Sequence, residues 1–189
     1  YQFREYDFKD EGIKVIKITQ INDKGLDINN CSYVNKNLLE ILKKKIIKQG
    51  DVLMALTGAT LGKTCFVKDL NEPVLQNYRV GRFEIKNNEF NKMFIYFLLN
   101  TKKITSQIFN NVNSGAQGNI GKSDFIKVKI IKPLLPEQQR IAEILSQIDN
   151  TIEKEEAYKQ KLERIKKGLM EDLLTGRVRV NKLIKEKEV

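Results

Sequence analysis

The sequence predicts an α/β (α+β) globular domain followed by one long C-terminal coiled-coil α-helix, and three observations support this fold class. Residues 1–132 alternate short β-branched stretches with helical stretches, which is typical of a mixed fold. Residues 137–174 contain no proline and a single glycine, a composition that favours one continuous helix. With 189 residues, of which 41% are hydrophobic, the chain can bury a sizeable core.

Short strands and helices are predicted in the first 132 residues from the period of their apolar side chains. The predicted strands are 12–21 (GIKVIKITQI), 51–56 (DVLMAL), 63–67 (KTCFV) and 78–85 (YRVGRFEI). One or two helices are predicted at 91–109, with a break near Asn100. Another helix is predicted at 35–46 (NKNLLEILKKKI), whose inward-facing side chains would be Leu38, Leu39, Ile41 and Leu42.

The long C-terminal helix has clear start and stop signals. Pro136 suits the first helical position, Glu137 lies in the positively polarised first turn, and Gly176 supplies a stop. A helix over about 137–174 has roughly 38 residues and is about 57 Å long. A domain of about 130 residues is only about 30 Å across, so its own globule cannot cover such a helix.

A heptad pattern on this helix predicts what covers it. Seven of ten seam positions are apolar, in two blocks with a polar middle formed by Thr151 and Glu155, and Asp172 is the third polar position. We therefore expect a partner helix, from a second copy or from another part of a longer chain; a surface helix lying on its own domain is the alternative. The predicted dimer residues are Ile141, Ile144, Ile148, Tyr158, Leu162, Ile165 and Leu169.

The positive charge lies mostly in the first part of the chain. The net charge is +10; residues 1–132 hold 22 Lys+Arg against 13 Asp+Glu, and residues 133–189 hold 12 against 11. A basic globule predicts a polyanionic partner, and nucleic acid fits better than a membrane because no segment is a basic amphipathic helix with aromatic anchors. The alternative is a solvated lysine-rich surface.

Composition also limits the other functional classes. The longest apolar run, residues 93–99, is far shorter than the roughly 20 residues that span a bilayer, so no membrane segment is expected. The chain has two cysteines, no CxxC spacing and no histidine, so we expect no metal site, no cofactor and a cytoplasmic location. The N-terminus has neither a signal pattern nor an initiator Met, and we expect it to begin inside a longer chain.

Two similar glycine loops are the candidate binding elements. Three residues separate Gly58 from Gly62 in TGATLGKT (57–64), and five separate Gly115 from Gly121 in SGAQGNIGKSDF (114–125); an ATP-binding P-loop needs four. We expect contacts to DNA phosphates instead, from Lys63 and Lys122, with Gly58 allowing close approach of the backbone. Candidate base contacts are Thr57, Thr60, Arg79, Gln117 and Asn119. The alternative is that the glycines only form turns.

Two other functions are compatible with parts of the sequence. Glu84-Ile85-Lys86 has the E-x-K spacing of metal-dependent nucleases, and Asp69 could supply a second carboxylate. Such triplets are common in a chain with 31% charged residues. A structural interaction protein, with the helix as its functional part, is the other alternative, but such a protein does not need a strongly basic globule.

The chain resembles the specificity (S) subunit of type I restriction–modification systems. Residues 132–180, from KPLLPEQQRIAEIL to KKGLMEDLLTGRVRV, resemble the conserved region that closes such subunits. Upstream, three segments resemble the target recognition domain of that family in the order that the family shows: 13–28 (IKVIKITQINDKGLDI), 50–64 (GDVLMALTGATLGKT) and 114–125. The match to the C-terminal region is long and specific.

The resemblance implies a function and a set of partners. It implies a double-stranded DNA-binding subunit that has no catalysis of its own and positions methyltransferase (M) and restriction (R) subunits on a bipartite target. Family members normally have two recognition domains and two long antiparallel helices, whereas this chain has one of each. The resemblance is compatible with a half-length subunit and with the C-terminal half of a full subunit. For a half-length subunit we expect a homodimer through antiparallel long helices that reads an interrupted palindrome. The expected domains are a recognition domain at 1–132, the conserved helical region at 133–180 and a tail at 181–189.

Overall fold

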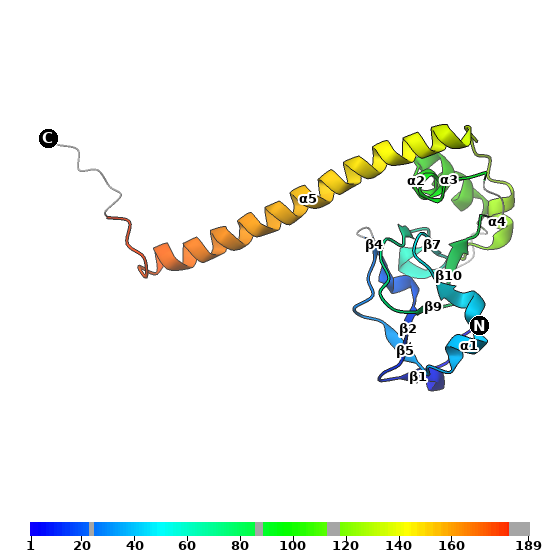
Figure 1. Cartoon of the computed structure of the whole chain (residues 1–189), viewed down its shortest axis with the longest axis horizontal. Coiled ribbons are helices and arrows are strands. Elements are labelled where there is room, and N and C mark those ends of the chain that lie inside the picture. The colour runs from blue at the N-terminus through cyan, green and yellow to red at the C-terminus, as the bar shows by residue number, and fades with distance from the viewer. Residues whose placement is uncertain (23–24, 86–88, 113–117, 182–189) are drawn as a thin grey trace. The chain divides into compact units, whose positions relative to one another are not determined.

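The computed structural model describes residues 1–22, 25–85, 89–112 and 118–181 (Figure 1). The chain forms two compact units, Tyr1–Ala142 and Glu143–Val189. The first unit contains every strand that the structure describes, and the second consists mainly of one helix. The predicted fold class, an α/β domain followed by a long C-terminal helix, is confirmed.

A five-stranded sheet forms one layer of the first unit. Its strand order is β1 (Phe8–Lys9), β5 (Ser32–Val34), β2 (Ile13–Ile16), β9 (Val74–Gln76) and β6 (Ile46–Ile47). Strands β2 and β9 are parallel, and the other neighbours are antiparallel. Parallel pairing brings Lys14 opposite Val74, so this sheet joins segments that are far apart in the chain.

A three-stranded antiparallel sheet forms the next layer. Its order is β10 (Val80–Phe83), β7 (Val52–Ala55) and β8 (Thr64–Phe66), which confirms the strands predicted at 51–56 and 63–67. All four residues of β7 are buried, because successive side chains point to opposite faces and both faces are covered. Strands β3 (Ile21–Asn22) and β4 (Gly25–Leu26) form a separate two-stranded antiparallel hairpin.

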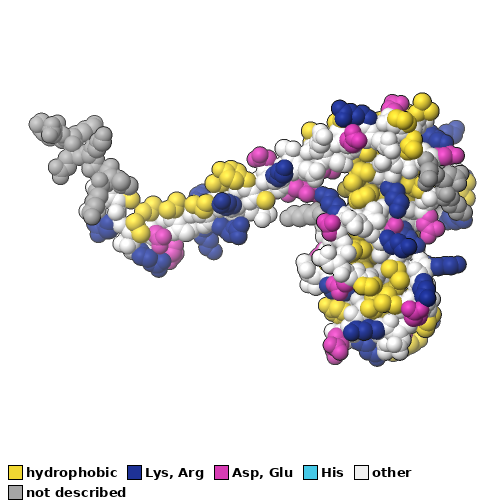
Figure 2. All heavy atoms as spheres, in the orientation of Figure 1, with side chains coloured by type: hydrophobic (Ala, Val, Ile, Leu, Met, Phe, Trp, Pro, Cys, Tyr) yellow, Lys and Arg dark blue, Asp and Glu magenta, His cyan; other side chains and the backbone are white. Residues whose placement is uncertain are grey.

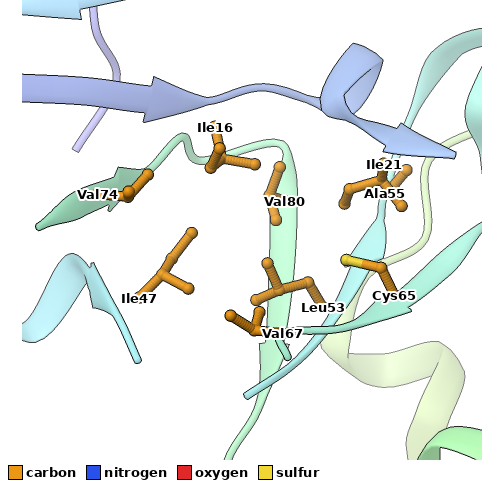
Figure 3. Close-up of a cluster of buried hydrophobic side chains, with 9 residues drawn as sticks. All are labelled: Ile16, Ile21, Ile47, Leu53, Ala55, Cys65, Val67, Val74 and Val80. Atoms are coloured by element: carbon orange, nitrogen blue, oxygen red, sulfur yellow. The ribbon is translucent and has the colours of Figure 1, made fainter. Parts of the chain in front are cut away.

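The two larger sheets share one core cluster (Figure 3). Its side chains come from both sheets and the segments beside them: Ile16, Ile21, Ile47, Leu53, Ala55, Cys65, Val67, Val74 and Val80. Burial raises the pKa of the Cys65 thiol to about 12. A second cluster lies around the five-stranded sheet and consists of Phe3, Ile13, Val15, Val34, Leu42 and Leu75.

Two helices, α2 (Lys92–Leu99) and α3 (Lys102–Asn111), pack through a third cluster that includes side chains of β7. The predicted break is confirmed, since Asn100 is the C-cap residue of α2. At the other end of α2, the Asn91 side chain accepts a hydrogen bond from the Phe94 backbone N–H at 2.9 Å. The buried members of the cluster are Val52, Met54, Leu99, Ile104, Ile108 and Ile120.

The helix predicted over 35–46 is wrong. The chain forms only a four-residue helix α1 (Leu38–Ile41) and the 3-10 helix η3 (Lys43–Lys45) before entering strand β6. Ile41, predicted to face inward, is 72% exposed. Ile46 instead pairs with Leu75 of β9, so long-range strand pairing overrides the local helical pattern.

Short 3-10 helices interrupt or end several predicted strands. The strand predicted over 12–21 stops at Ile16, because η2 (Ile18–Gln20) separates β2 from β3. The remaining short elements are η1 (Glu5–Asp7), η4 (Gly58–Thr60) and α4 (Lys122–Ile126).

Helix α5 (Leu135–Leu174) has 40 residues, which corresponds to about 60 Å. It begins slightly earlier than predicted and is followed by Gly176, whose N–H donates to the Leu173 carbonyl at 3.3 Å. Its first turns belong to the first unit, where Gln138 and Ala142 are buried. Among the residues that the structure describes, no helix is long and apolar enough to cross a membrane.

Candidate nucleic-acid interface

The stretch TGATLGKT is the hairpin turn between β7 and β8. The Ala55 N–H donates to the Lys63 carbonyl at 2.9 Å, and the Gly62 N–H donates to the Ala55 carbonyl at 2.8 Å. Gly58 and Gly62 have φ values of 75° and 81°, a conformation that other residues rarely adopt. A Cβ on Gly62 would lie 2.7 Å from Cζ of Phe109. Turn geometry and packing therefore explain these two glycines.

The second glycine loop lies directly beside this turn. Thr57 and Asn119 form an antiparallel β-bridge, and the Ile120 N–H donates to the Leu56 carbonyl at 2.9 Å. A Cβ on Gly118 would meet Cδ2 of Leu61 at 3.2 Å. The two loops that resemble each other in sequence thus form one structural feature.

Two further segments join the same feature. The Leu56 N–H donates to the Arg79 carbonyl at 2.9 Å, which places the turn between β9 and β10 next to Leu56 as well. The Thr60 hydroxyl donates to the Ile18 carbonyl at 3.0 Å, which attaches η2 to the hairpin turn.

We call these four segments the loop surface: Lys17–Gln20, Thr57–Lys63, Asn77–Arg79 and Gly118–Lys122. They contain four Lys or Arg residues and no Asp or Glu, and one adjoining carboxylate, Asp124, accepts the Gly121 N–H at 2.7 Å, so the balance of charge is positive. Arg79 and Lys122 are exposed. Lys17 is engaged elsewhere, since its ammonium donates to Ser32 Oγ at 2.7 Å and lies 4.0 Å from the Phe8 ring centroid.

The structure brings most of the predicted DNA contacts together. Thr57, Gly58, Thr60, Lys63, Arg79, Asn119 and Lys122 all lie on the loop surface. Thr57, Thr60 and Lys63 are half-buried and Asn119 is exposed. Gln117 lies outside the described residues.

Sequence reasoning missed Thr19 and Tyr78, two exposed side chains of the loop surface. The signal available for Tyr78 was an aromatic residue next to an arginine at the start of the strand predicted over 78–85, whereas the structure begins this strand only at Val80. Nothing in the local sequence marks Thr19, because it reaches this surface only through the pairing of η2 with the hairpin turn.

Of the residues of the nuclease alternative, the structure describes Asp69 and Glu84. Glu84 is paired with Arg82, with 2.9 Å between Oε1 and the guanidinium, and Asp69 is exposed in the loop after β8. Lys86 lies outside the described residues. In the part of the chain that the structure describes, no group of three or more His, Cys, Asp or Glu residues could hold a metal ion.

An apolar stripe follows α5 in the second unit (Figure 2). Of the seven predicted seam residues, Ile141 is half-buried and the other six are 46–57% exposed. Such a stripe of large exposed apolar side chains marks an interaction surface. Further exposed apolar residues on this helix are Leu145, Ile152, Met170, Leu173 and Leu174.

Solved structures share this fold. The crystal structure of the HsdS subunit from Thermoanaerobacter tengcongensis matches 87% of this chain and 44% of its own, with a TM-score of 0.60 and 16% identity. A chain from a study of complex assembly and conformational transition of the type I R-M system matches 90% of this chain and 41% of its own, with a TM-score of 0.58 and 18% identity. At these identities the likeness shows the fold alone.

Sequence relatives and a family model identify the family. The MjaVIII specificity subunit of a type I restriction enzyme from Methanocaldococcus jannaschii is 31% identical over 96% of this chain, and the putative MjaX specificity subunit of the same organism is 28% identical over 94%. The chain spans 43% of the length of each relative. The model of the type I restriction modification DNA specificity domain matches residues 3–164. This chain therefore belongs to the family of type I restriction–modification specificity subunits.

Proposed function

We propose that this chain is a non-catalytic DNA-recognition subunit that binds one half of a bipartite double-stranded target. The observation that carries the proposal is the loop surface, where Arg79, Asn119 and Lys122 are exposed on segments that are joined through Leu56 and Thr57. Guanidinium, amide and ammonium groups are the side chains that contact base edges and phosphates. The site of action would be the cytoplasm, where the DNA is.

We further propose that two copies pair through the α5 seam in antiparallel orientation. In an antiparallel coiled coil, a positions of one helix face d positions of the other. If the two-fold axis passes at Glu153, Ile148 faces Tyr158 and Ile141 faces Ile165 of the second copy, while the polar residues Thr151 and Glu155 meet at the centre. A shift by one heptad would put Asp172 opposite Ile141. The seam is therefore self-complementary in the first register.

The methyltransferase and restriction subunits are the proposed partners of this dimer. A candidate contact for the methyltransferase subunit is the groove near the end of α5, because Met170 and Leu174 lie there outside the a and d positions and are 49% and 79% exposed. Its lining residues are Glu163, Lys166, Lys167, Met170, Glu171, Leu174 and Thr175. Leu174→Glu should reduce co-purification of the methyltransferase subunit and leave the dimer intact.

Sequencing of methylated bases in DNA from cells that carry the complete system tests the proposal. A symmetric interrupted motif is expected from a dimer with two identical recognition domains. Absence of any motif-specific methylation, in cells where the subunits are expressed, would contradict the proposed function. A bipartite motif with two different halves would retain DNA recognition and overturn the homodimer.

Gel shifts with purified protein separate DNA recognition from a purely structural role. Binding to duplex DNA should weaken steeply between low and moderate salt, because bound phosphates release counterions. If the chain purified with its methyltransferase subunit binds no duplex even at low salt, the structural interaction protein becomes the better description. Cleavage that depends on Mg²⁺ and is lost in Glu84→Ala would instead support the nuclease.

A further inference from the structure

Tyr78 presents an exposed aromatic ring on the loop surface. Its side chain is 41% exposed, and the Arg79 guanidinium carbon lies 5.2 Å from the ring centroid, within the range of a cation–π contact. The Arg79 backbone carbonyl accepts the Leu56 N–H, so this pair stands beside the Thr57–Asn119 bridge. The ring and the guanidinium thus lie together on the loop surface.

Several hydrogen bonds hold the turn that carries the pair. Asn77 is 7% exposed, its Oδ1 accepts the Arg79 N–H at 3.1 Å, and its backbone carbonyl accepts the Val80 N–H at 3.0 Å. The Asn77 N–H donates to the Ile16 carbonyl at 3.0 Å, which ties the turn to β2. The buried side chain of Gln76 donates to the Val80 carbonyl. A side chain on such a turn loses little backbone freedom when it meets a ligand.

The chemistry of the pair fits the major groove of DNA. Arginine recognises the O6 and N7 atoms of guanine, and the C5-methyl group of thymine is the apolar feature of that groove. Tyr78 offers an apolar ring face and a hydroxyl within one side chain, next to the arginine. Polar groups of Thr57 and Asn119 on the neighbouring chains would contact adjacent bases or phosphates.

We propose that Tyr78 is a specificity-determining residue whose ring packs against the C5-methyl group of a thymine, beside the base that Arg79 contacts. This inference rests on the proposed DNA-recognition function. It assigns a base contact to a residue in a turn that is separate from both glycine loops.

The test compares methylated motifs in cells that carry the complete system with wild-type, Tyr78→Ala, Tyr78→Phe and Tyr6→Ala chains. Tyr6 is the matched control, because it is 74% exposed and precedes β1 at the outer edge of the five-stranded sheet. We expect Tyr78→Ala to accept other bases at one thymine position of the motif. Tyr78→Phe and Tyr6→Ala should keep the wild-type motif, since the first retains the ring and the second leaves the loop surface intact.

A binding measurement covers the case in which Tyr78→Ala removes all methylation. Each thymine of the target is replaced singly by uracil, which lacks the methyl group. The wild-type affinity should fall about fourfold at one position, the change expected for one buried methyl-sized group, and the affinity of Tyr78→Ala should not change there. The inference is overturned if the Tyr78→Ala motif is unchanged, if it relaxes only at G·C pairs, or if no uracil replacement affects the wild type. Wild-type cells without any methylated motif would instead refute the proposed function.

Discussion

The side-chain oxygen of Gln138, in the first turn of α5, accepts a hydrogen bond at 3.0 Å from the backbone N–H of Asn91, the residue that caps α2. The Gln138 amide nitrogen donates to the carbonyls of Glu89 and Pro133 at 3.0 Å and 2.8 Å. The side chain is fully buried, and these three hydrogen bonds all join it to backbone groups. One glutamine therefore anchors the start of the long helix to the first unit.

Replacement of Gln138 by Leu should destabilise the first unit strongly. The change leaves one N–H and two carbonyls without their partner in a partly buried setting, and an unsatisfied group that is shielded from water costs about 1–3 kcal/mol. We expect the free energy of unfolding to fall by about 3 kcal/mol in urea denaturation. The exposed neighbour Gln139 provides the control, since Gln139→Leu should change stability by less than about 0.5 kcal/mol. Equal effects of the two substitutions would show that the buried amide network contributes little.

Gly62→Ala should destabilise the hairpin turn. The residue would have to adopt a φ of 81° and displace the ring of Phe109, so we expect a loss of about 1–3 kcal/mol in thermal unfolding. Gly168→Ala is the comparison, because it lies within α5 with open space around its Cα and should stabilise the helix by up to about 1 kcal/mol. A stable Gly62→Ala variant that has lost DNA binding would instead indicate that the glycine is needed for backbone contact with phosphate.

Lys122→Ala should weaken binding to all duplex sequences alike. Lys122 is exposed on the loop surface, and removal of one phosphate contact lowers the slope of log affinity against log salt by about one. Fluorescence anisotropy at several salt concentrations measures this slope. The exposed Lys36, which lies outside the loop surface, is the control, and Lys36→Ala should leave the slope unchanged. A sequence-selective loss of affinity in Lys122→Ala would assign this lysine to a base instead.

Ile148→Lys should convert the dimer to a monomer. The charge would lie in the seam opposite Tyr158 of the second copy, whereas Asn150→Lys changes an exposed position outside the seam and should remain dimeric. Sedimentation of both variants measures their mass. A wild-type chain that sediments as a monomer at tens of micromolar would refute the homodimer.

Disulfide cross-linking tests the register of the pairing. In a Cys31→Ser background, Ile148→Cys combined with Tyr158→Cys should form a covalent dimer under mild oxidation, because these positions face each other when the axis passes at Glu153. The pair Ile148→Cys with Leu169→Cys should not cross-link. In this register Ile148 faces Tyr158 of the second copy, and Leu169 lies about 16 Å farther along the helix, out of reach of a disulfide. The opposite outcome on a non-reducing gel would place the axis elsewhere.

The two cysteines should react very differently with thiol reagents at pH 8. Burial raises the pKa of Cys65 to about 12, so its thiol remains neutral and unreactive in the folded chain. Cys31 is only half-buried, and burial raises its pKa in the same direction without enclosing the sulfur. Mass spectrometry after brief labelling should find the label on Cys31 first.

The raised pKa of Cys65 also predicts how stability depends on pH. The folded state favours the neutral thiol, so the stability that Cys65 contributes should be lost as pH rises from 9 toward 12.

Local patterns predicted the elements whose stability is local. The α5 helix follows from its composition and its Pro136 and Gly176 boundaries, and the break at Asn100 follows from a polar stretch between two apolar ones. Strand β7 was predicted because a short apolar run bounded by turn residues is typical of a buried strand. The prediction of a helix over 35–46 was wrong because it used local periodicity alone. Ile46 pairs with Leu75, which lies far away in the sequence.

The sequence by itself determined the family, the basic first part of the chain and the apolar seam of α5, because these depend on composition and on the period of side chains along one segment. Only the tertiary structure decided which residues form a site. The Leu56 N–H bonds to the Arg79 carbonyl and the Leu56 carbonyl to the Ile120 N–H, so backbone pairing brings together segments far apart in the chain. Tyr78 belongs to the proposed interface through this pairing alone. Its role depends on the chains beside it, which the order of residues around it does not specify.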